Sequence, residues 1–141
     1  MCSRLGNKKL KPNNVFPYKS SSGTQYGLWG FNEGQVYNAR AESLRTVWKD
    51  KHDNRGVIFV ESFWEGNTRF KRKDNKLFAM AVIYNDKDEF ALVTAPANDV
   101  VKKYHHRMPL LLADDQVEHW LSKETNEVIN FPEDQMIPEA A

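Results

Sequence analysis

The only cysteine of the chain, Cys2, follows Met1 directly. If Met1 were removed, Cys2 would carry an α-amine and a thiol on neighbouring carbons, and such a 1,2-aminothiol reacts with aldehydes. The amine forms a Schiff base with the carbonyl carbon, and the thiol then closes a five-membered thiazolidine ring. Because the ordinary pKa is about 8.5 for a thiol and about 8 for an α-amine, both groups need a neighbour that accepts protons. Cys2 is therefore a candidate nucleophile; the alternative is a second residue without a chemical role.

Three further segments contain polar side chains that could assist such a nucleophile. They read Asn-Ala-Arg-Ala-Glu-Ser at residues 38–43, Glu-Ser-Phe-Trp-Glu-Gly at residues 61–66 and His-His-Arg-Met-Pro at residues 105–109. In this order, behind the Met-Cys start, they resemble the SRAP family, the SOS-response-associated peptidase-like proteins that crosslink to abasic DNA. The resemblance runs from Cys2 to about Leu121. The chain resembles a shortened member, because the stretch between Cys2 and Asn38 is shorter than is usual in that family.

The resemblance implies roles for four residues. Cys2 matches the nucleophile that attacks the aldehyde of an abasic deoxyribose, and Asn38 matches an amide that orients the N-terminal residue. Glu65 matches a carboxyl group that can move protons while the Schiff base forms and the sugar ring opens. His105 matches the family histidine, and an imidazole with an ordinary pKa near 6.5 can donate and accept protons at neutral pH. Its neighbour His106 is the fallback for this role.

Arginine and aromatic side chains are the expected DNA contacts. The resemblance assigns Arg40 to a backbone phosphate, and Arg4 is close to the nucleophile in sequence. An arginine fork can bind phosphate through two hydrogen bonds, and Arg45 would lie one helical turn further along. Tyr26 and Trp29 could stack on exposed bases, although aromatic side chains beside strands more often belong to the core.

The charge is unevenly distributed along the chain. The net charge is only +1, but residues 1–73 are strongly basic and residues 74–141 are acidic. A basic half is compatible with a phosphate-lined partner, unless the two halves interleave in space and their charges cancel. The basic run at residues 69–73 is either a second phosphate contact or a solvated charged segment.

These observations predict covalent capture of abasic sites in single-stranded DNA through a thiazolidine at Cys2, after autocatalytic removal of Met1. The Schiff base could also cleave the DNA strand by β-elimination, which is an abasic-site lyase activity. Two alternatives stay open. Cys2, His105 and Asn38 could form the Cys-His-Asn set of a thiol peptidase, or the chain could be a noncatalytic module that binds single-stranded DNA.

The composition is that of one globular domain. The chain has 141 residues, 40% of them hydrophobic and 28% charged, and this length fits a single domain. No apolar run approaches the roughly 18 residues of a membrane span, and no apolar segment typical of a secretory signal follows the N-terminus. One cysteine excludes an internal disulfide and a multi-cysteine zinc site. We therefore expect a cytoplasmic monomer without a metal, another cofactor or a membrane partner.

The hydrophobic pattern predicts short strands and short helices in a single α+β domain with an antiparallel, barrel-like β-sheet. The polar loop at residues 85–89 favours an antiparallel hairpin between the apolar runs on either side of it. We expect the SRAP-like domain at residues 1–131 and an acidic, flexible tail at residues 132–141. The expected strands cover residues 57–60, 76–84, 90–94 and 108–112, and the expected helices cover residues 42–49, 98–104 and 114–121.

Overall fold

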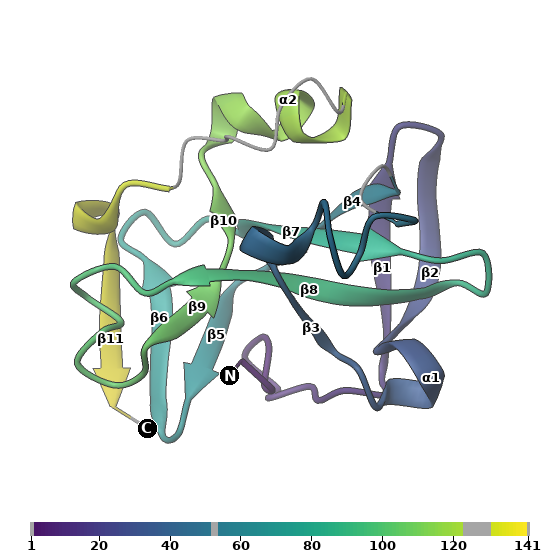
Figure 1. The fold of residues 1–141 in the computed structure, drawn as a ribbon. Coiled ribbons are helices and arrows are strands. Elements are labelled where there is room, and N and C mark those ends of the chain that lie inside the picture. Colours follow the sequence, from purple (N-terminus) through teal and green to yellow (C-terminus); the bar gives the residue numbers. More distant parts are fainter. Residues whose placement is uncertain (1, 52–53, 123–130, 141) are drawn as a thin grey trace.

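The computed structural model describes residues 2–51, 54–122 and 131–140. Strands are the main regular secondary structure, and a few short helices lie outside the sheets (Figure 1). Within the described residues, the larger sheet has the strand order β10-β7-β4-β1-β2-β8-β3, and β9 pairs with β8. Further pairing between β7 and β8 curls this sheet back on itself. The predicted α+β class and barrel-like sheet are therefore confirmed.

The elements have the following bounds. The strands of the larger sheet are β1 (Val15–Ser20), β2 (Gly23–Trp29), β3 (Asn38–Arg40), β4 (Arg55–Val60), β7 (Phe78–Tyr84), β8 (Glu89–Pro96), β9 (Arg107–Pro109) and β10 (Leu111–Leu112). A three-stranded sheet with the order β11-β6-β5 is formed by β5 (Ser62–Glu65), β6 (Thr68–Arg72) and β11 (Met136–Ala140). The helices are α1 (Phe31–Gly34), α2 (Val117–Ser122) and the 3₁₀ turns η1 (Ala41–Ser43), η2 (Asp114–Gln116) and η3 (Glu133–Gln135).

Strand β7 separates two hydrophobic cores, because successive side chains of a strand point to opposite faces. The first face contributes to a core with many aromatic side chains, and the second to a core that is covered by Trp120 and Leu121 of α2. Residues on the first face are Phe78, Met80 and Val82, and those on the second are Ala79, Ala81 and Ile83. Burial on both faces explains why this stretch of the sequence is almost continuously apolar.

The N-terminal segment lies along β5, as Figure 1 shows at the marked N-terminus. Leu5 forms an antiparallel bridge with Phe63, and the Trp64 amide donates a hydrogen bond of 3.1 Å to the Arg4 carbonyl. Leu5 is fully buried. The segment that begins at Cys2 is therefore held against the strand that ends at Glu65.

Two expected elements differ from the structure. The predicted helix at residues 42–49 is only the 3₁₀ turn η1 followed by hydrogen-bonded turns. The predicted helix at residues 98–104 is also a series of turns, although Asn98 Oδ1 does accept the amide hydrogens of Val100 and Val101 at 3.0 Å each. The predicted strand at residues 108–112 is divided into β9, which pairs with β8, and β10, which pairs with β7. The other predicted strands, the β7–β8 hairpin and the helix that contains Trp120 are present.

The acidic segment at the C-terminus is ordered, which corrects the expectation of a flexible tail from residue 132. Strand β11 pairs antiparallel with β6 over five residues, and Met136 is almost fully buried. In the described part of the chain, no helix combines the length and the apolar character that crossing a bilayer would require.

Candidate active site

Asn38 binds the backbone of Cys2. It is the first residue of β3, whose parallel pairing with β8 fixes its position opposite Leu92. The side-chain amide donates hydrogen bonds to the Cys2 carbonyl at 3.2 Å and to the Tyr37 carbonyl at 2.9 Å. Its oxygen, Oδ1, is buried and has no hydrogen-bond partner among the described residues. Asn38 can therefore hold the start of the chain with its amide hydrogens and still accept one more hydrogen bond.

The Cys2 thiol is completely buried. Burial raises its pKa to about 12, and the negative charge of Glu65 acts in the same direction. The sulfur lies 3.8 Å from the Arg4 carbonyl oxygen, to which the thiol can donate a weak hydrogen bond. In this arrangement the sulfur stays protonated at neutral pH, because the thiolate would be poorly solvated.

Glu65 is a buried carboxyl group at the end of β5. Gly66, in the left-handed conformation at φ 60°, directly follows it and begins the two-residue turn to β6. Glu65 is 9% exposed, and its Oε1 atom has no hydrogen-bond partner among the described residues. Burial raises the pKa of Glu65, whereas the positive charges of the amino terminus and of His105 act to lower it. The carboxyl group is thus electrostatically coupled to both the start of the chain and an imidazole.

His105 is held by the backbone that follows it. Its Nδ1 atom lies 3.0 Å from the Arg107 amide nitrogen and 3.2 Å from the Arg107 carbonyl oxygen. Neutral His105 can accept the amide hydrogen at Nδ1, which leaves its proton on Nε2, and a protonated ring can donate to the carbonyl instead. The His105 ring also stacks on His106, with 4.4 Å between ring centroids and an interplanar angle of 23°. The Arg107 backbone and the His106 ring therefore fix the orientation of the His105 imidazole.

An ion pair between buried Arg107 and the half-exposed carboxylate of Glu42 joins the two segments that carry Asn38 and His105. Arg107 donates two hydrogen bonds to the Glu42 carboxylate, at 2.6 and 2.9 Å, and two more to the carbonyl and hydroxyl of Thr94. Arg107 is only 5% exposed. Its hydrogen bonds lower the pKa of Glu42 to about 2. Sequence reasoning missed the role of this pair, although both residues belong to the motifs at 38–43 and 105–109.

The expected DNA contacts divide into two groups. Arg4, Arg40, Arg45 and Tyr26 are exposed, and Tyr26 retains 72% of its surface. Trp29, in contrast, is fully buried, and its indole N–H donates a 2.9 Å hydrogen bond to a backbone carbonyl. The expectation that Trp29 stacks on DNA bases is therefore wrong, because its ring packs in the first hydrophobic core.

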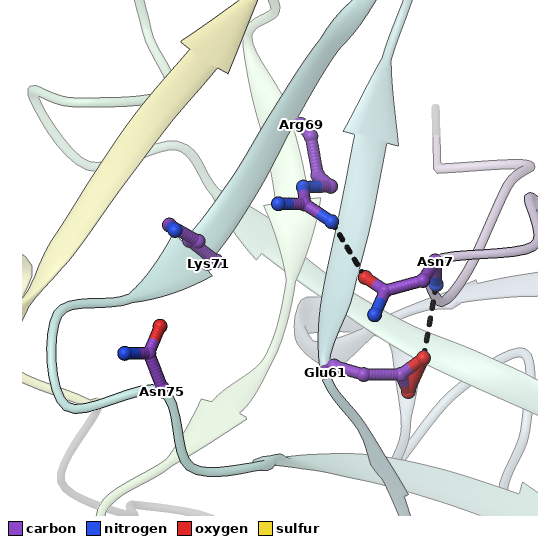
Figure 2. A pocket seen from close by; sticks show the side chains of 5 residues that line it. All are labelled: Asn7, Glu61, Arg69, Lys71 and Asn75. Atoms are coloured by element: carbon purple, nitrogen blue, oxygen red, sulfur yellow. Dashed lines mark hydrogen bonds between the residues drawn. The ribbon is translucent and has the colours of Figure 1, made fainter. Parts of the chain in front are cut away.

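The basic run at residues 69–73 is largely paired with acidic side chains. Arg69 and Lys71 both contact Glu139 of β11, and Arg72 is buried between Asp74 and Asp114. Arg69 and Lys71 line a hollow of about 220 Å³ together with Asn7, Glu61 and Asn75. Figure 2 shows these five side chains. In this hollow, Arg69 donates a 2.7 Å hydrogen bond to the side-chain oxygen of Asn7, and the backbone amide of Asn7 donates to the Glu61 carboxylate. These contacts already neutralise most of the positive charge that would be needed to bind a second phosphate.

In the described part of the chain, no three His, Cys, Asp or Glu side chains gather closely enough to hold a metal ion. The available groups are an aminothiol precursor, an amide, a carboxyl group with a raised pKa and an imidazole.

The fold and the site define a single-domain α+β protein that gathers an amide, a carboxyl group and an imidazole around a cysteine at the start of the chain. The chain belongs to the SOS response associated peptidase (SRAP) family, whose model matches residues 21–137. The matched range includes Asn38, Glu65 and His105 and begins after Cys2.

The chain is similar in sequence to curated relatives and in fold to solved structures. The chain is 29% identical over 108 residues to abasic site processing protein YoqW of Bacillus subtilis, covering 62% of this chain and 48% of the relative. It is 27% identical over 108 residues to abasic site processing protein YobE of the same organism, and the match covers 62% of this chain and 49% of that relative. The chain spans about half the length of these relatives. A structure from Bordetella bronchiseptica has a TM-score of 0.75 at 17% sequence identity, and the match covers 94% of this chain and 86% of that one. A structure from Bacteroides thetaiotaomicron has a TM-score of 0.69 at 20% sequence identity, and the match covers 91% of this chain and 74% of that one.

Proposed function

We propose that this protein captures abasic sites in single-stranded DNA by forming a thiazolidine between Cys2 and the deoxyribose aldehyde. Two lines of evidence support this proposal. The curated relatives are named abasic site processing proteins. The observation that carries the proposal is the 3.2 Å hydrogen bond from Asn38 to the Cys2 carbonyl. That bond holds the only cysteine at a site with two groups that can transfer protons.

The reaction begins with hydrolysis of the bond between Met1 and Cys2, which the protein catalyses on itself in our proposal. The freed amine adds to the aldehyde carbon, and loss of one water molecule gives a Schiff base. The sulfur then bonds to the same carbon, and the thiol proton goes to the nitrogen. The product is a thiazolidine that keeps the DNA attached to the protein.

The raised pKa values favour a sequence in which the amine reacts first. The Cys2 thiol is a poor thiolate source while it is buried, so the thiol becomes useful only when the Schiff base is already in place. Glu65 has a raised pKa, and it is therefore a better proton acceptor than an ordinary carboxylate. In this scheme Glu65 takes a proton from the amine or thiol, and His105 gives a proton to the sugar oxygen as the ring opens.

The same Schiff base gives the proposed site a lyase activity. The imine withdraws electrons from the sugar, so a base can remove the adjacent proton and expel the 3′ phosphate by β-elimination. Exposed Arg4, Arg40 and Arg45 are the proposed contacts to the flexible DNA backbone, and Tyr26 is a proposed stacking surface for a base. Single strands fit this scheme, because stacking needs unpaired bases.

The peptidase alternative receives less support from the geometry. A Cys-His-Asn peptidase uses a thiolate, whereas burial and the charge of Glu65 both disfavour the thiolate of Cys2. The Asn38 amide contacts the Cys2 backbone, which is a suitable arrangement for orienting the chain terminus. We therefore assign peptide hydrolysis to the removal of Met1 alone.

One experiment tests the proposal directly. The full-length protein is incubated with a single-stranded oligonucleotide that carries one abasic site and, separately, with an intact oligonucleotide of the same sequence. We expect the protein to have lost Met1 and to form a heat-stable adduct with the abasic strand alone, as measured by intact mass and by a shifted band.

The Cys2→Ala variant is the matched test of the linkage. We expect it to form no heat-stable adduct, and an adduct at the wild-type yield would refute the thiazolidine. Cleavage of an unrelated peptide by the wild-type protein would favour the peptidase. Salt-sensitive binding to both oligonucleotides without an adduct would favour a noncatalytic binding module.

A further inference from the structure

His106 has an exposed imidazole beside the candidate site, and the proposed chemistry gives this imidazole no role. One face of its ring stacks on His105 at 4.4 Å between centroids. The stack fixes the ring in place while the side chain remains open to solvent. A fixed, exposed imidazole is a suitable group for binding a negatively charged ligand, provided that it carries a proton.

The fold brings His106 near the exposed guanidinium of Arg40. Thr94 of β8 pairs with Arg40 on one side and with Pro109 of β9 on the other. Arg107, the first residue of β9, pairs with Pro96, so the turn that carries His106 lies beside the end of β8, beyond the point opposite Arg40. The ion pair between Glu42 and Arg107 connects the same two segments. Arg40 and His106 are thus on two segments that are tied together, and both side chains face solvent.

The charged groups around His106 are cations. Partial loss of hydration lowers the pKa of His106, and the positive charges of His105, the amino terminus, Arg40 and Arg107 lower it further. The carboxylate in this region, Glu42, is already bound by Arg107. Arg40 itself makes no ion pair within 4 Å among the described residues. An anion placed between Arg40 and His106 would therefore meet two solvent-exposed donors, although the Glu42 carboxylate already offsets part of the charge of Arg40.

We propose that Arg40 and His106 together bind one backbone phosphate of single-stranded DNA, and that His106 does so only when it is protonated. This inference rests on the proposed function, because that function supplies DNA as the partner. A bound phosphate would offset the repulsion from the neighbouring cations, so the complex would take up a proton. DNA binding would consequently be tighter and more salt-dependent in weak acid than in weak base.

The test measures the affinity for an intact single-stranded oligonucleotide, which has no aldehyde, at several salt concentrations and at about pH 5.5 and about pH 8. For single strands, each phosphate contact contributes about 0.7 to the slope of log affinity against log salt. We expect the wild-type slope to be steeper by about 0.7 at the lower pH. His106→Phe keeps an aromatic ring for the stack and should show the shallower slope at both pH values. His106→Lys should show the steeper slope at both.

His119→Phe is the matched control, since it removes an exposed histidine from α2. We expect it to keep the wild-type pH dependence. An unchanged pH dependence in His106→Phe would overturn the proposal, as would a slope in His106→Lys that still varies with pH. The outcome is separable from the capture reaction, because covalent adducts are scored in a different experiment with abasic DNA. Failure of capture would leave the measured pH dependence intact.

Discussion

Glu65 has a carboxyl oxygen that is buried without a hydrogen-bond partner among the described residues. Such a group lowers stability when it is ionised, because the protein replaces its hydration incompletely. Glu65→Gln keeps the shape of the side chain and removes the charge. We predict a variant that melts at a higher temperature than the wild type at neutral pH but captures abasic DNA about 10²- to 10⁴-fold more slowly. Thermal melting and single-turnover capture rates measure the two effects.

The pH dependence of this difference follows from the direction of the pKa shift. Burial raises the pKa of Glu65, so the folded protein binds this proton more tightly than the unfolded chain does. Stability from the protonated group is therefore complete below the ordinary glutamate pKa of about 4.3 and is lost as the pH rises through the raised value. We expect the stability advantage of Glu65→Gln to vanish below about pH 4. A variant that is less stable than the wild type at pH 7 would contradict this account.

At the residue scale, sequence reasoning worked best where chemistry limits the choice of side chain. A lone cysteine behind Met1 and three polar motifs were sufficient to select residues that the structure brings together, as the contact between Asn38 and Cys2 shows. It failed for Trp29, whose environment depends on β8 and on the carbonyl of Tyr37. Exposed and buried aromatic residues are indistinguishable in a single sequence when both occur beside strands.

At the scale of elements, the ion pair between Glu42 and Arg107 holds the segment after β3 against β9. Removing the Glu42 charge leaves a buried guanidinium with fewer acceptors, and such a loss costs about 1–3 kcal/mol. We predict that Glu42→Gln lowers the free energy of unfolding by this amount at neutral pH, as measured by urea denaturation. Because its pKa is lowered to about 2, the contribution of Glu42 should be lost as the pH falls from about 4.3 towards that value.

Glu118→Gln is the appropriate comparison for this prediction. Glu118 is an exposed partner of Lys19 at 3.7 Å, and exposed pairs contribute about 0–1 kcal/mol. If both substitutions had equal effects, the ion pair of Arg107 would have no special role in holding the two segments. A larger effect for Glu42→Gln that disappears in strong acid would support that role.

The missed helix at residues 42–49 shows why local periodicity can mislead. Leu44 is buried and Trp48 packs on Phe31, with 5.5 Å between ring centroids. Val47, which the helical pattern placed on the same face, is 70% exposed. A series of turns is sufficient to bury Leu44 and to pack Trp48 on Phe31. The spacing of apolar residues therefore indicated the packing of Leu44 and Trp48 correctly, but not the exposure of Val47 or the backbone conformation.

For the whole molecule, the C-terminal strand is part of the fold. Strand β11 covers one edge of β6, and Met136 contributes to the first hydrophobic core. Losing a buried methionine side chain alone costs about 2–5 kcal/mol. We predict that a chain ending at residue 131 unfolds at a clearly lower urea concentration than the full chain.

Glu139→Ala is the control for this truncation, because it removes the contacts to Arg69 and Lys71 but leaves β11 in place. These partly exposed pairs should contribute about 1 kcal/mol or less. If the truncated chain were as stable as the full chain, the pairing of β11 would not contribute to the core. If Glu139→Ala were as unstable as the truncated chain, the ion pairs would be the main contribution of the tail.

The opposite charges of the two chain halves partly neutralise each other in the folded molecule. Arg69 and Lys71 of the basic half meet Glu139 of the acidic half, so the halves do interleave there. Sequence reasoning could not foresee this contact, because the pairing of β11 with β6 joins segments more than 60 residues apart. Long-range strand pairing is specified by the whole fold and leaves only a weak trace in local composition.

The complete burial of Cys2 has a practical consequence for anyone who handles this protein. Alkylating reagents and disulfide dyes react with accessible thiolates, so the native fold should behave as if it contained no sulfhydryl at all. Labelling would begin only when the first residues swing away from β5. The rate of such labelling would then measure how often the N-terminal segment leaves β5.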